Sequence, residues 1–440
     1  MIPAGFEPVL RELAPVRDRF AAAGHRLYLV GGTVRDLLAA DGRTDFDLDA
    51  TTPARPAEVK QLLKGWADAL WTQGERFGTI GAMKRTVDPV TGAEVERIYE
   101  ITTHRADSYD GATRKPTVEF ADDIVADLSR RDFTVNAMAI ELTAAEPALV
   151  DPFHGADDLR DRVLRTPLEP HVSFSDDPLR MLRAARFVAR YQLVPVPELV
   201  AAIREMTARL EIVSAERIHA EMDKLVVAPQ PAGGLAFLLD TGIAAHVLPE
   251  LLAATPAIRA HTIAVVDAVP NDLRQVRMAA LFHALGASAA STRLRAWKAS
   301  NTDIEAVTTI VAQFTRWRDL ADQHGAWTDP TVRRLVHGAR GHVDDVFTLA
   351  RVDASTAGDS VRLARLDALA AHIDELAARE PIDDFAPELD GAQVMELLGL
   401  APGRDVGAAL AHLQQVRLDR GLLGRGAVEA LVRQWWRERA

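Results

Sequence analysis

The pattern of hydrophobic and polar positions changes once along this 440-residue chain. Residues 1 to about 150 mix helical stretches with alternating or β-branched runs that are typical of strands, such as RLYLVGG, DFDLDATT, TIGAMKRTV and ERIYEITT. From about residue 155 onward, apolar residues recur at i, i+3 and i+4 in stretches rich in Ala, Leu and Arg, which predicts amphipathic helices. The sequence therefore predicts an α+β fold, with a small α/β head followed by a long all-helical region.

Proline-containing stretches interrupt the helical region and indicate domain boundaries. They are TPLEP at 166–170, VVAPQPAGG at 226–234 and AREPIDDFAPELDG at 378–391. The length is also too great for one ordinary core, and no internal repeat is present. We expect four parts: a catalytic head at 1–150, a helical neck at 151–229, a helical body at 230–380 and a C-terminal helical tail at 381–440.

Composition and charge narrow the class of protein. No apolar run approaches the roughly 20 residues that a membrane span needs, and the N-terminus MIPAGFEPVLREL lacks the basic start and apolar core of a signal peptide. The absence of cysteine excludes disulfides and thiolate metal sites. We expect a cytoplasmic protein without a membrane partner. The net charge of -12 argues against indiscriminate nucleic-acid binding, although a polyanion can still dock on local basic surface.

Three aspartates, Asp45, Asp47 and Asp49, occupy alternate positions of one predicted strand. Their side chains share a face of that strand. Two carboxylates about 6 to 7 Å apart repel by roughly 2 to 3 kcal/mol at an effective dielectric near 20. A divalent ion relieves this repulsion, and Mg²⁺ characteristically takes one or two carboxylates plus substrate phosphates. The alternative is a solvated edge strand, which is the commoner explanation of an isolated D-x-D pair.

The residues before the aspartates favour binding of a phosphate. VGG ends an apolar strand, and TVRDLL then begins a helix with Thr33 near its N-cap. Gly31 and Gly32 let a phosphate approach the backbone, where free N–H groups and the helix dipole favour an anion. The stretch is not a P-loop, because G-x-x-x-x-G-K-[ST] is absent. A phosphate cradle and a metal-binding strand are therefore expected close together in the chain.

These stretches and five later blocks together resemble the class II nucleotidyltransferases, the bacterial-type CCA-adding enzymes and their poly(A) polymerase relatives. The resemblance covers most of the chain, and the motifs follow in the family's order. They are LVGGTVRDLL with TDFDLDATT, YEITTHR at 99–105, RRDFTVNAMAI at 130–140, DPFHGADDLRDRVLR at 151–165, DDPLRMLRAARFVAR at 176–190 and SAERIHAEMDKLV at 214–226, together with the C-terminal LDGAQVMELLGLAPGRDVGAAL.

The resemblance implies a CCA tRNA nucleotidyltransferase that builds or repairs the 3′-terminal CCA of tRNA from CTP and ATP. It makes Asp45 and Asp47 the Mg²⁺-binding pair. We favour Glu100 over Asp49 as the third carboxylate, although spacing alone does not decide between them. Two ions held there would lower the pKa of the RNA 3′-hydroxyl and neutralise the charge of the departing pyrophosphate. The expected catalytic residues are Asp45, Asp47 and Glu100.

The resemblance further implies a protein template for the incoming base. Asp177 and Arg180, three residues apart and pointing the same way if they are helical, match that template. A carboxylate accepts from the exocyclic amine of C or A while a guanidinium donates to the ring nitrogen, which rejects G and U. The ordinary alternative is a surface salt bridge. Asp176 stands where the family usually has Glu. The expected nucleotide-binding residues are Gly31, Gly32, Arg35, Arg131, Asp132, Asn136, Asp177, Arg180, Arg183 and Arg186.

In the block RRDFTVNAMAI, Asp132 and Asn136 are i, i+4 neighbours if it is helical. Arg130 or Arg131 can grip a phosphate there, and Asn136 can hydrogen-bond a ribose or phosphate oxygen. An exposed helix start with ordinary charges is the alternative.

Two features separate the branches of this family. The segment QGERFGTIGAMK lacks the Gly-Arg-Arg-Phe-type stretch of the poly(A) polymerases and is more similar to the CCA-adding branch. The polar stretch between Arg105 and Phe120 resembles the flexible loop that lets one site switch from C to A, which disfavours an enzyme adding only CC. An enzyme that adds only the final A, or a poly(A) polymerase, stays open as an alternative.

Residues 260–286 resemble the helices of an HD-type phosphohydrolase, whose His-Asp pair here reads His283-Ala284. Because a carboxylate ligand is missing and no clustered histidine follows soon after, we expect a helical scaffold without a working metal site. His261 and His283 would then be packing or surface residues, and a phosphohydrolase is the less favoured alternative.

The remaining expectations concern partners. We expect tRNA, CTP and ATP as partners and a monomer or homodimer. C-terminal arginines could contact RNA phosphates, and for each of them a solvated helix face is at least as plausible. They are Arg417, Arg420, Arg425, Arg433, Arg437 and Arg439. Trp435 and Trp436 are expected to be partly buried packing residues.

Overall fold

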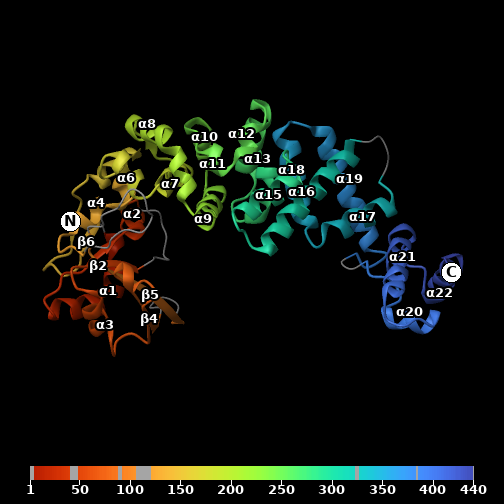
Figure 1. The fold of residues 1–440 in the computed structure, drawn as a ribbon, viewed down its shortest axis with the longest axis horizontal. Coiled ribbons are helices and arrows are strands. Elements are labelled where there is room, and N and C mark those ends of the chain that lie inside the picture. Colours follow the sequence, from red (N-terminus) through yellow and green to blue (C-terminus); the bar gives the residue numbers. More distant parts are fainter. Residues whose placement is uncertain are drawn as a thin grey trace. The chain divides into compact units, whose positions relative to one another are not determined.

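The computed structural model describes residues 4–39, 48–87, 92–105, 120–322, 327–382 and 385–439 (Figure 1). The chain divides into two compact units. Unit 1 comprises Met1–Glu221 and Gly233–Val247, and unit 2 comprises Met222–Ala232 and Leu248–Ala440. Strands of the main sheet all lie in unit 1, and the regular secondary structure described in unit 2 is helical. The predicted α+β fold, a small α/β head followed by helices, is confirmed, whereas the boundaries of the four predicted parts stay a prediction.

The head is built on a mixed sheet with the strand order β3-β4-β5-β2-β1-β6-β7 in the described residues. Only the β2–β5 pair is parallel among the seven strands of this sheet. This pairing places Asp49 of β2 opposite Glu100 of β5, so their side chains share one face. The strands are β1 (Tyr28–Val30), β2 (Leu48–Thr52), β3 (Ala69–Trp71), β4 (Thr79–Val87), β5 (Glu94–Thr103), β6 (Ala139–Glu141) and β7 (Ala148–Val150).

Helix α1 (Glu7–Ala22) and helix α3 (Pro56–Leu63) pack together and contribute to the main core of the head. Val9, Leu13, Val16 and Phe20 recur every three or four residues along α1 and are buried, as expected for one apolar face of a helix. They join Leu29, Ala50, Ile80 and Ile101 from the strands in one cluster. The opposite surface of the β2 and β5 strands, which carries Asp49 and Glu100, is left for polar side chains.

The remaining elements described in unit 1 are helices, two short strands and four 3₁₀ segments. Helix α7 (Leu179–Tyr191) buries Leu182, Ala185 and Ala189, which recur every three or four residues. The short elements are β8 (Val163–Leu164) and β9 (Val194–Pro195), which pair in parallel, and the 3₁₀ segments η1 (Ala4–Phe6), η2 (Glu75–Phe77), η3 (Thr134–Asn136) and η4 (Thr207–Ile212). The helices are α2 (Gly32–Leu38), α4 (Ile124–Ser129), α5 (Gly155–Asp161), α6 (Pro170–Asp176), α7 (Leu179–Tyr191), α8 (Pro197–Met206), α9 (Ala215–Val226), α10 (Pro231–Thr241) and α11 (Ala244–Val247).

In unit 2, helix α16 packs against α14, α15 and α18, which forms the helical body. The C-terminal helices α20, α21 and α22 have a separate hydrophobic cluster, against which Trp435 packs. The helices of this unit are α12 (Pro249–Ala253), α13 (Pro256–Ala268), α14 (Arg274–Phe282), α15 (Ala287–Ala296), α16 (Asn301–Asp322), α17 (Asp329–Ala339), α18 (Val343–Thr356), α19 (Ser360–Ala377), α20 (Gly391–Leu398), α21 (Arg404–Arg420) and α22 (Arg425–Arg439).

One of the C-terminal arginines is not available to RNA. Arg417 is buried, and its guanidinium forms an ion pair with Glu380, which also pairs with Arg333 at 2.6 Å. Neither of the two alternatives expected for Arg417, a phosphate contact or a solvated helix face, is correct, because its buried charge is compensated by Glu380 inside the protein. Trp435 stacks on His412 with the two rings 8° from parallel, in agreement with the packing role expected from the sequence.

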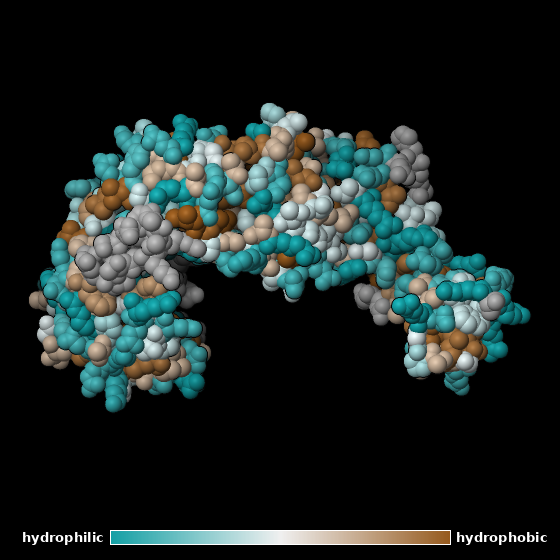
Figure 2. Space-filling view, viewed as in Figure 1, coloured by the Kyte–Doolittle hydropathy of each residue, from teal (hydrophilic) through white to brown (hydrophobic). Residues whose placement is uncertain are grey.

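The face of the molecule shown in Figure 2 is predominantly polar. Hydrophilic residues cover most of the face shown in Figure 2, and hydrophobic residues form small separate patches on it. Among the described helices, none combines the length and the apolar character that crossing a membrane requires.

Candidate active site

A hollow of about 330 Å³ lies in unit 1 where the head meets the neck. Most of its lining is polar, and it carries four arginines and three aspartates. The lining residues are Gly31, Gly32, Asp49, Arg130, Arg131, Asp132, Asn136, Asp177, Arg180 and Arg183. The structure thus brings together eight of the ten nucleotide-binding residues expected from the sequence, although Gly31 and Arg183 are 152 positions apart along the chain.

Gly31 shapes the floor of this hollow. It directly follows β1 and is the N-cap of α2, with a φ of 79° that glycine adopts without strain. A Cβ on Gly31 would lie 3.6 Å from both Nη1 of Arg131 and Oδ2 of Asp49, so the backbone lies beside a cation and a carboxylate. The helix starts at Gly32 rather than near Thr33 as expected, because the turn is made by the positive φ of Gly31.

Asp127 holds the two neighbouring arginines, Arg130 and Arg131, in place. It is buried on α4, and its carboxylate accepts hydrogen bonds from Arg130 Nη2 at 3.0 Å, Arg131 Nη2 at 3.3 Å and the backbone N–H of Arg105 at 3.2 Å. Burial alone would raise the pKa of Asp127, but the two guanidinium groups lower it below its ordinary value. Asp127 was missed by the sequence analysis, although an acid three and four residues before two arginines is a recognisable helical pairing.

A second network is centred on Asp132. Arg183 of α7 donates from Nε at 2.9 Å and from Nη2 at 2.5 Å to Oδ2 of Asp132, and Asn136 Nδ2 donates to Oδ1 at 3.0 Å. Burial opposes ionisation of Asp132, but Arg183 and Asn136 outweigh it and hold its pKa well below the usual range. Only residues 134–136 form a short helix, so the Asp132–Asn136 contact crosses the start of η3 rather than one regular helical turn.

Arg35 and Arg186 do not line the hollow but support its walls. Arg35 of α2 is buried, donates to Oδ1 of Asn136 at 2.5 Å and lies over the ring of Tyr191 at 4.2 Å from its centre. Arg186 donates from Nε to Glu221 at 2.6 Å. Arg35 therefore connects α2 to the neck helix α7, and Arg186 connects α7 to α9. The role of Glu221 was also not predicted from the sequence, although Glu221 lies within the motif SAERIHAEMDKLV.

Asp177 and Arg180 both line the hollow, but only Arg180 is helical. Asp177 has an extended backbone between α6 and α7, because Pro178 follows it, and its Oδ1 accepts the N–H of Leu179 at 3.1 Å. The expected i, i+3 helical pairing is therefore replaced by a cap and first-turn arrangement. Oδ2 of Asp177 pairs instead with Arg217 Nη2 at 2.7 Å. Arg217 was missed because it comes from α9, 40 residues farther along the chain.

The guanidinium of Arg180 is held by backbone and hydroxyl acceptors rather than by a carboxylate. Its Nη1 donates to Oγ of Ser173 at 2.8 Å and to the carbonyl oxygen of Ser173 at 3.2 Å, and its Nη2 donates to the carbonyl oxygen of Arg130. Because the side chain is buried, these acceptors fix its direction.

The expected carboxylates of the metal site are described only in part. Asp45 and Asp47 lie outside the described residues. Asp49 lines the hollow, and Glu100, which is exposed, is its register partner on the adjacent strand. Side chains at paired positions of neighbouring strands lie side by side, so these two carboxylates are oxygen donors suited to a hard divalent cation.

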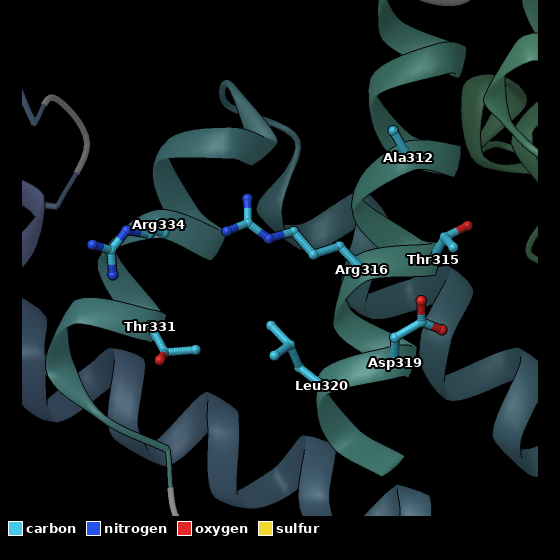
Figure 3. Close-up of a pocket in the computed structure, with 7 residues that line it drawn as sticks. All are labelled: Ala312, Thr315, Arg316, Asp319, Leu320, Thr331 and Arg334. Carbon is cyan, nitrogen blue, oxygen red and sulfur yellow. The ribbon is translucent and has the colours of Figure 1, made fainter. Parts of the chain in front are cut away.

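A second hollow, of about 470 Å³, lies in unit 2 between α16 and α17 (Figure 3). Arg316 extends from α16 toward α17, and Leu320 projects from α16 into the same space. Arg334 forms an ion pair with Asp419, and Asp319 adds a negative charge to the lining. Asp419 therefore balances Arg334, whereas Asp319 pairs with Arg318 at 3.4 Å.

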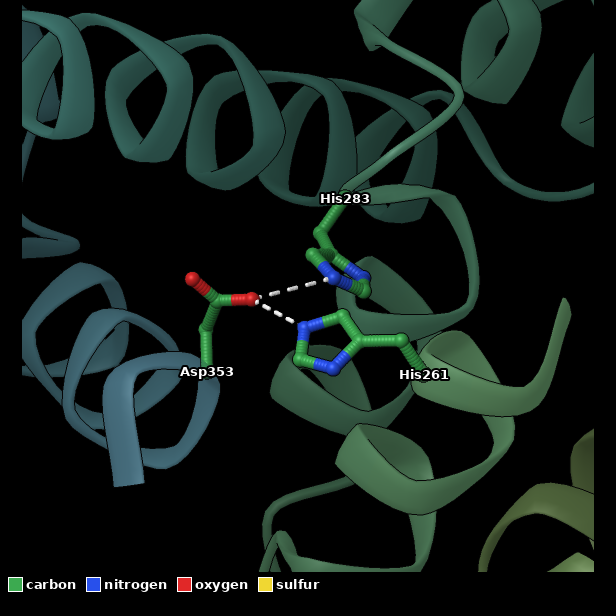
Figure 4. Close-up of side chains that lie close together, drawn as sticks. All are labelled: His261, His283 and Asp353. Carbon is green, nitrogen blue, oxygen red and sulfur yellow. Dashed lines mark hydrogen bonds and ion pairs between the residues drawn. The ribbon is translucent and has the colours of Figure 1, made fainter. Parts of the chain in front are cut away.

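The segment similar to HD-type phosphohydrolases is helical, as expected, and contains α13 and α14. His261 and His283, however, lie close together, and Asp353 of α18 lies against both (Figure 4). This carboxylate was not expected from the sequence, because α18 follows His283 along the chain only after α15, α16 and α17.

Comparisons with known proteins identify relatives of this chain. A sequence family described as "Poly A polymerase head domain" matches residues 27–165, and one described as "Probable RNA and SrmB- binding site of polymerase A" matches residues 196–255. The CCA-adding enzyme of Geobacillus stearothermophilus is 33% identical over 315 residues, which are 70% of this chain and 72% of that protein. The chain belongs to the family of CCA-adding enzymes.

Members of the CCA-adding enzyme family match over nearly the whole chain. The enzyme of Lacticaseibacillus paracasei is 29% identical over 417 residues, covering 93% of this chain and 92% of its own. Among solved structures, the Bacillus stearothermophilus CCA-adding enzyme in complex with CTP covers 100% of this chain and 99% of its own, with a TM-score of 0.71 and 27% identity. The expectation of a nucleotidyltransferase of this family, made from the motifs, is confirmed.

Proposed function

We propose that this protein adds or repairs the 3′-terminal CCA of tRNA, using CTP and ATP. The observation that carries the proposal is the hollow in which Asp177 and Arg180 lie together with Gly31, Arg131 and Asp132. A base-reading pair and several phosphate-binding groups around one space are what addition of a nucleotide without a nucleic-acid template requires. The names of the relatives support the same activity.

Selection of the base is assigned to Asp177 and Arg180. Cytosine and adenine each present an exocyclic amine beside an unprotonated ring nitrogen, so a carboxylate can accept from the first while a guanidinium donates to the second. Guanine and uracil present a carbonyl and a ring N–H instead, which would face Asp177 and Arg180 with the wrong polarity. The three hydrogen bonds that fix Arg180 mean that its donors are directed before a nucleotide arrives.

Binding of the triphosphate is assigned to Arg131, with Arg130 beside it, at the turn formed by Gly31 and Gly32. Asp127 accepts hydrogen bonds from both guanidinium groups and so fixes their orientation at the wall of the hollow. Asn136, whose amide oxygen is held by Arg35 and whose amide nitrogen is held by Asp132, is assigned to a ribose or phosphate oxygen. Arg183 and Arg186 hold α7 in position through Asp132 and Glu221.

Mg²⁺ is the proposed cofactor, with Asp45 and Asp47 as ligands and Glu100 as the third carboxylate. Asp49 and Glu100 share one sheet face beside the hollow, so the described donors suit an oxygen-liganded ion. When bound, such ions lower the pKa of an attacking hydroxyl and neutralise the charge of a departing pyrophosphate. The protein's own groups hold the base and the triphosphate so that the RNA 3′-hydroxyl can approach the α-phosphate in line.

An enzyme that adds only the terminal A and a poly(A) polymerase are the alternatives within the family. The names of the relatives favour complete CCA addition, and tRNA is accordingly the proposed RNA partner. A cytoplasmic location and a monomeric or homodimeric state stay predictions.

Supplying one nucleotide at a time distinguishes these activities. Transcripts of tRNA that lack CCA, tRNA that ends in CC and an unrelated RNA would each be incubated with CTP or ATP alone. We expect CTP to add two residues to the first RNA and ATP to add one to the second. Addition of ATP to tRNA ending in CC without any addition of CTP to tRNA lacking CCA would indicate the A-adding enzyme. Long tails on the unrelated RNA would indicate a poly(A) polymerase, and either result would contradict the proposal.

A further inference from the structure

Three potential metal ligands from different parts of the helical body meet in unit 2 (Figure 4). His261 lies on α13, His283 directly follows α14 and Asp353 lies on α18. Nε2 of His261 is 2.7 Å, and Nε2 of His283 is 3.4 Å, from the same oxygen, Oδ1 of Asp353. Ligand atoms of the group all lie within 4.8 Å of one another. Ligands around one tetrahedral ion lie about 3.3 to 3.6 Å apart, so small side-chain movements suffice to bind one.

The hydrogen bond of His283 determines which of its nitrogens can bind a metal. Its Nδ1 lies 2.6 Å from the carbonyl oxygen of Ala280, which only accepts, so Nδ1 carries a proton. Nε2 is buried and makes no hydrogen bond within the described part of the chain. In the neutral ring, Nε2 therefore directs a lone pair toward the carboxylate of Asp353. Metal-ligating histidines commonly donate their other ring N–H to a backbone carbonyl in this way.

Two acceptor atoms that face one another in a buried place repel unless a proton or a metal ion lies between them. The side chains of His283 and Asp353 are 2% and 7% exposed, so water does little to relieve this repulsion. A metal ion bound to the two histidine nitrogens and to Oδ1 of Asp353 satisfies all three atoms at once. The side chain of His261 is 31% exposed, which gives an ion a path from solvent.

Arg362 places a positive charge beside the three ligands, and carboxylates balance that charge. Its Nη1 donates to Oδ2 of Asp353 at 3.3 Å, which leaves Oδ1 directed at the histidines. The same guanidinium pairs with Asp322 at 3.4 Å and with Asp359 at 3.5 Å. Two further carboxylates thus offset Arg362, which here orients a ligand as groups outside a metal site commonly do.

We propose that His261, His283 and Asp353 bind a single transition-metal ion of the Zn²⁺ class, and that this ion stabilises the helical body by joining α13, α18 and the end of α14. Two imidazoles with one carboxylate favour such ions over Mg²⁺ or Ca²⁺. The residue after His283 is Ala284, and Oδ2 of Asp353 is engaged by Arg362, so the described group offers one metal-binding carboxylate oxygen. The site is therefore structural rather than hydrolytic, and it is independent of nucleotide addition.

Cobalt binding to the full chain tests this proposal. Chelator-treated protein would be titrated with Co²⁺, whose visible absorption bands report imidazole ligation, and its thermal unfolding would be followed with and without Zn²⁺. The variant His261→Gln keeps a donor for Asp353 but removes a metal ligand. The matched control is His372→Gln, because His372 makes a similar pair with Asp329 at 2.8 Å but belongs to no three-ligand group among the described residues.

We expect one Co²⁺ with imidazole bands in the wild type and in His372→Gln, and binding weaker by at least about tenfold in His261→Gln. Zn²⁺ should raise the Tm of the first two proteins and leave that of His261→Gln nearly unchanged. Absence of imidazole bands in the wild type, or equal affinity in His261→Gln, would overturn the metal site. Hydrolysis of p-nitrophenyl phosphate that disappears in His261→Gln would overturn its structural role. None of these readouts depends on nucleotide addition.

Discussion

Arg217 donates a 2.7 Å hydrogen bond from Nη2 to Oδ2 of Asp177, while Oδ1 of the same carboxylate accepts the backbone N–H of Leu179. Both oxygens of Asp177 are therefore engaged before a nucleotide arrives. An exocyclic amine must share Oδ2 with Arg217 or displace it, since each carboxylate oxygen has room for a second donor. In the proposed reaction, Arg217 is a positioning residue that sets the direction of the base-reading carboxylate.

Replacement of Arg217 by methionine should loosen base selection. We expect Arg217→Met to raise the KM for CTP and ATP several-fold and to increase incorporation of UTP, because Asp177 loses its orientation. Stability should change by less than about 1 kcal/mol, since the pair is partly exposed. Steady-state kinetics with each nucleotide measure the effect, with the exposed Arg204→Met as control. Unchanged KM and unchanged selectivity would show that Arg217 has no such role.

Arg180→Lys should be far more damaging than its charge conservation suggests. Lysine cannot reproduce the planar arrangement that donates to Ser173 and to the carbonyl oxygen of Arg130 while a further donor reads the base. We expect kcat/KM for CTP and ATP to fall on the order of 100-fold, the size expected when a buried charged hydrogen-bonding group is lost. Ser173→Ala, which removes one acceptor, should cost less. A lysine variant with near-normal kcat/KM would contradict the assignment.

The Asp132–Arg183 pair should support both stability and activity. Asp132→Asn leaves Arg183 with one acidic partner, Glu221 at 3.5 Å, and we expect a loss of about 1 to 3 kcal/mol in the free energy of unfolding. Urea unfolding measures it. The matched control is Asp157→Asn, which breaks the exposed pair with Arg160 and should cost less than about 1 kcal/mol. Equal losses of unfolding free energy in the two variants would show that the buried network stabilises the protein no more than an exposed ion pair does.

His104 should make folding sensitive to mild acid. It is buried at the end of β5, within hydrogen-bond distance of Thr51 at 2.9 Å, and burial lowers the pKa of its ring to about 4. An unfolded histidine has a pKa near 6.5, so between pH 6.5 and 4 the unfolded state binds more protons. Stability is therefore retained above pH 6.5 and lost as the pH falls toward 4, by at most about 3 kcal/mol.

The variant His104→Gln isolates this contribution. Between pH 7 and pH 4, its Tm should fall less steeply than the Tm of the wild type. The titration of all other groups is common to both proteins. If the two proteins lose stability in parallel over this range, the histidine is not the source of the pH dependence.

The sequence predicted the parts of the fold that depend on local periodicity. The alternating run before Thr103 became β5, and the repeated apolar positions of α1 became its buried face. The site residues could be chosen because motifs mark them, and the hollow contains Asp177 and Arg180 as well as Gly31. Local rules were less accurate at helix ends, where the positive φ of Gly31 and the position of Pro178 set the start of the helix.

Partners that come from distant parts of the chain were not predicted. Arg217 approaches Asp177, and Asp353 approaches His261 and His283, only because of how separate helices pack. The burial of Arg417 beside Glu380 was hidden for the same reason, since an arginine on a charged helix looks exposed until its tertiary partner is known. Periodicity specifies which face of a helix is buried, whereas pairing across helices depends on the whole fold.

The measurement that tests the central claim most directly is the choice of nucleotide by Asp177→Ala on tRNA lacking CCA. Wild-type protein and variant would each be given a mixture of CTP, ATP, UTP and GTP in the presence of Mg²⁺. The 3′ ends that they add would then be sequenced. We predict CCA ends from the wild type and a marked loss of preference for C and A in the variant. A variant that still adds CCA at full rate and with full selectivity would contradict the proposal that this side chain reads the base.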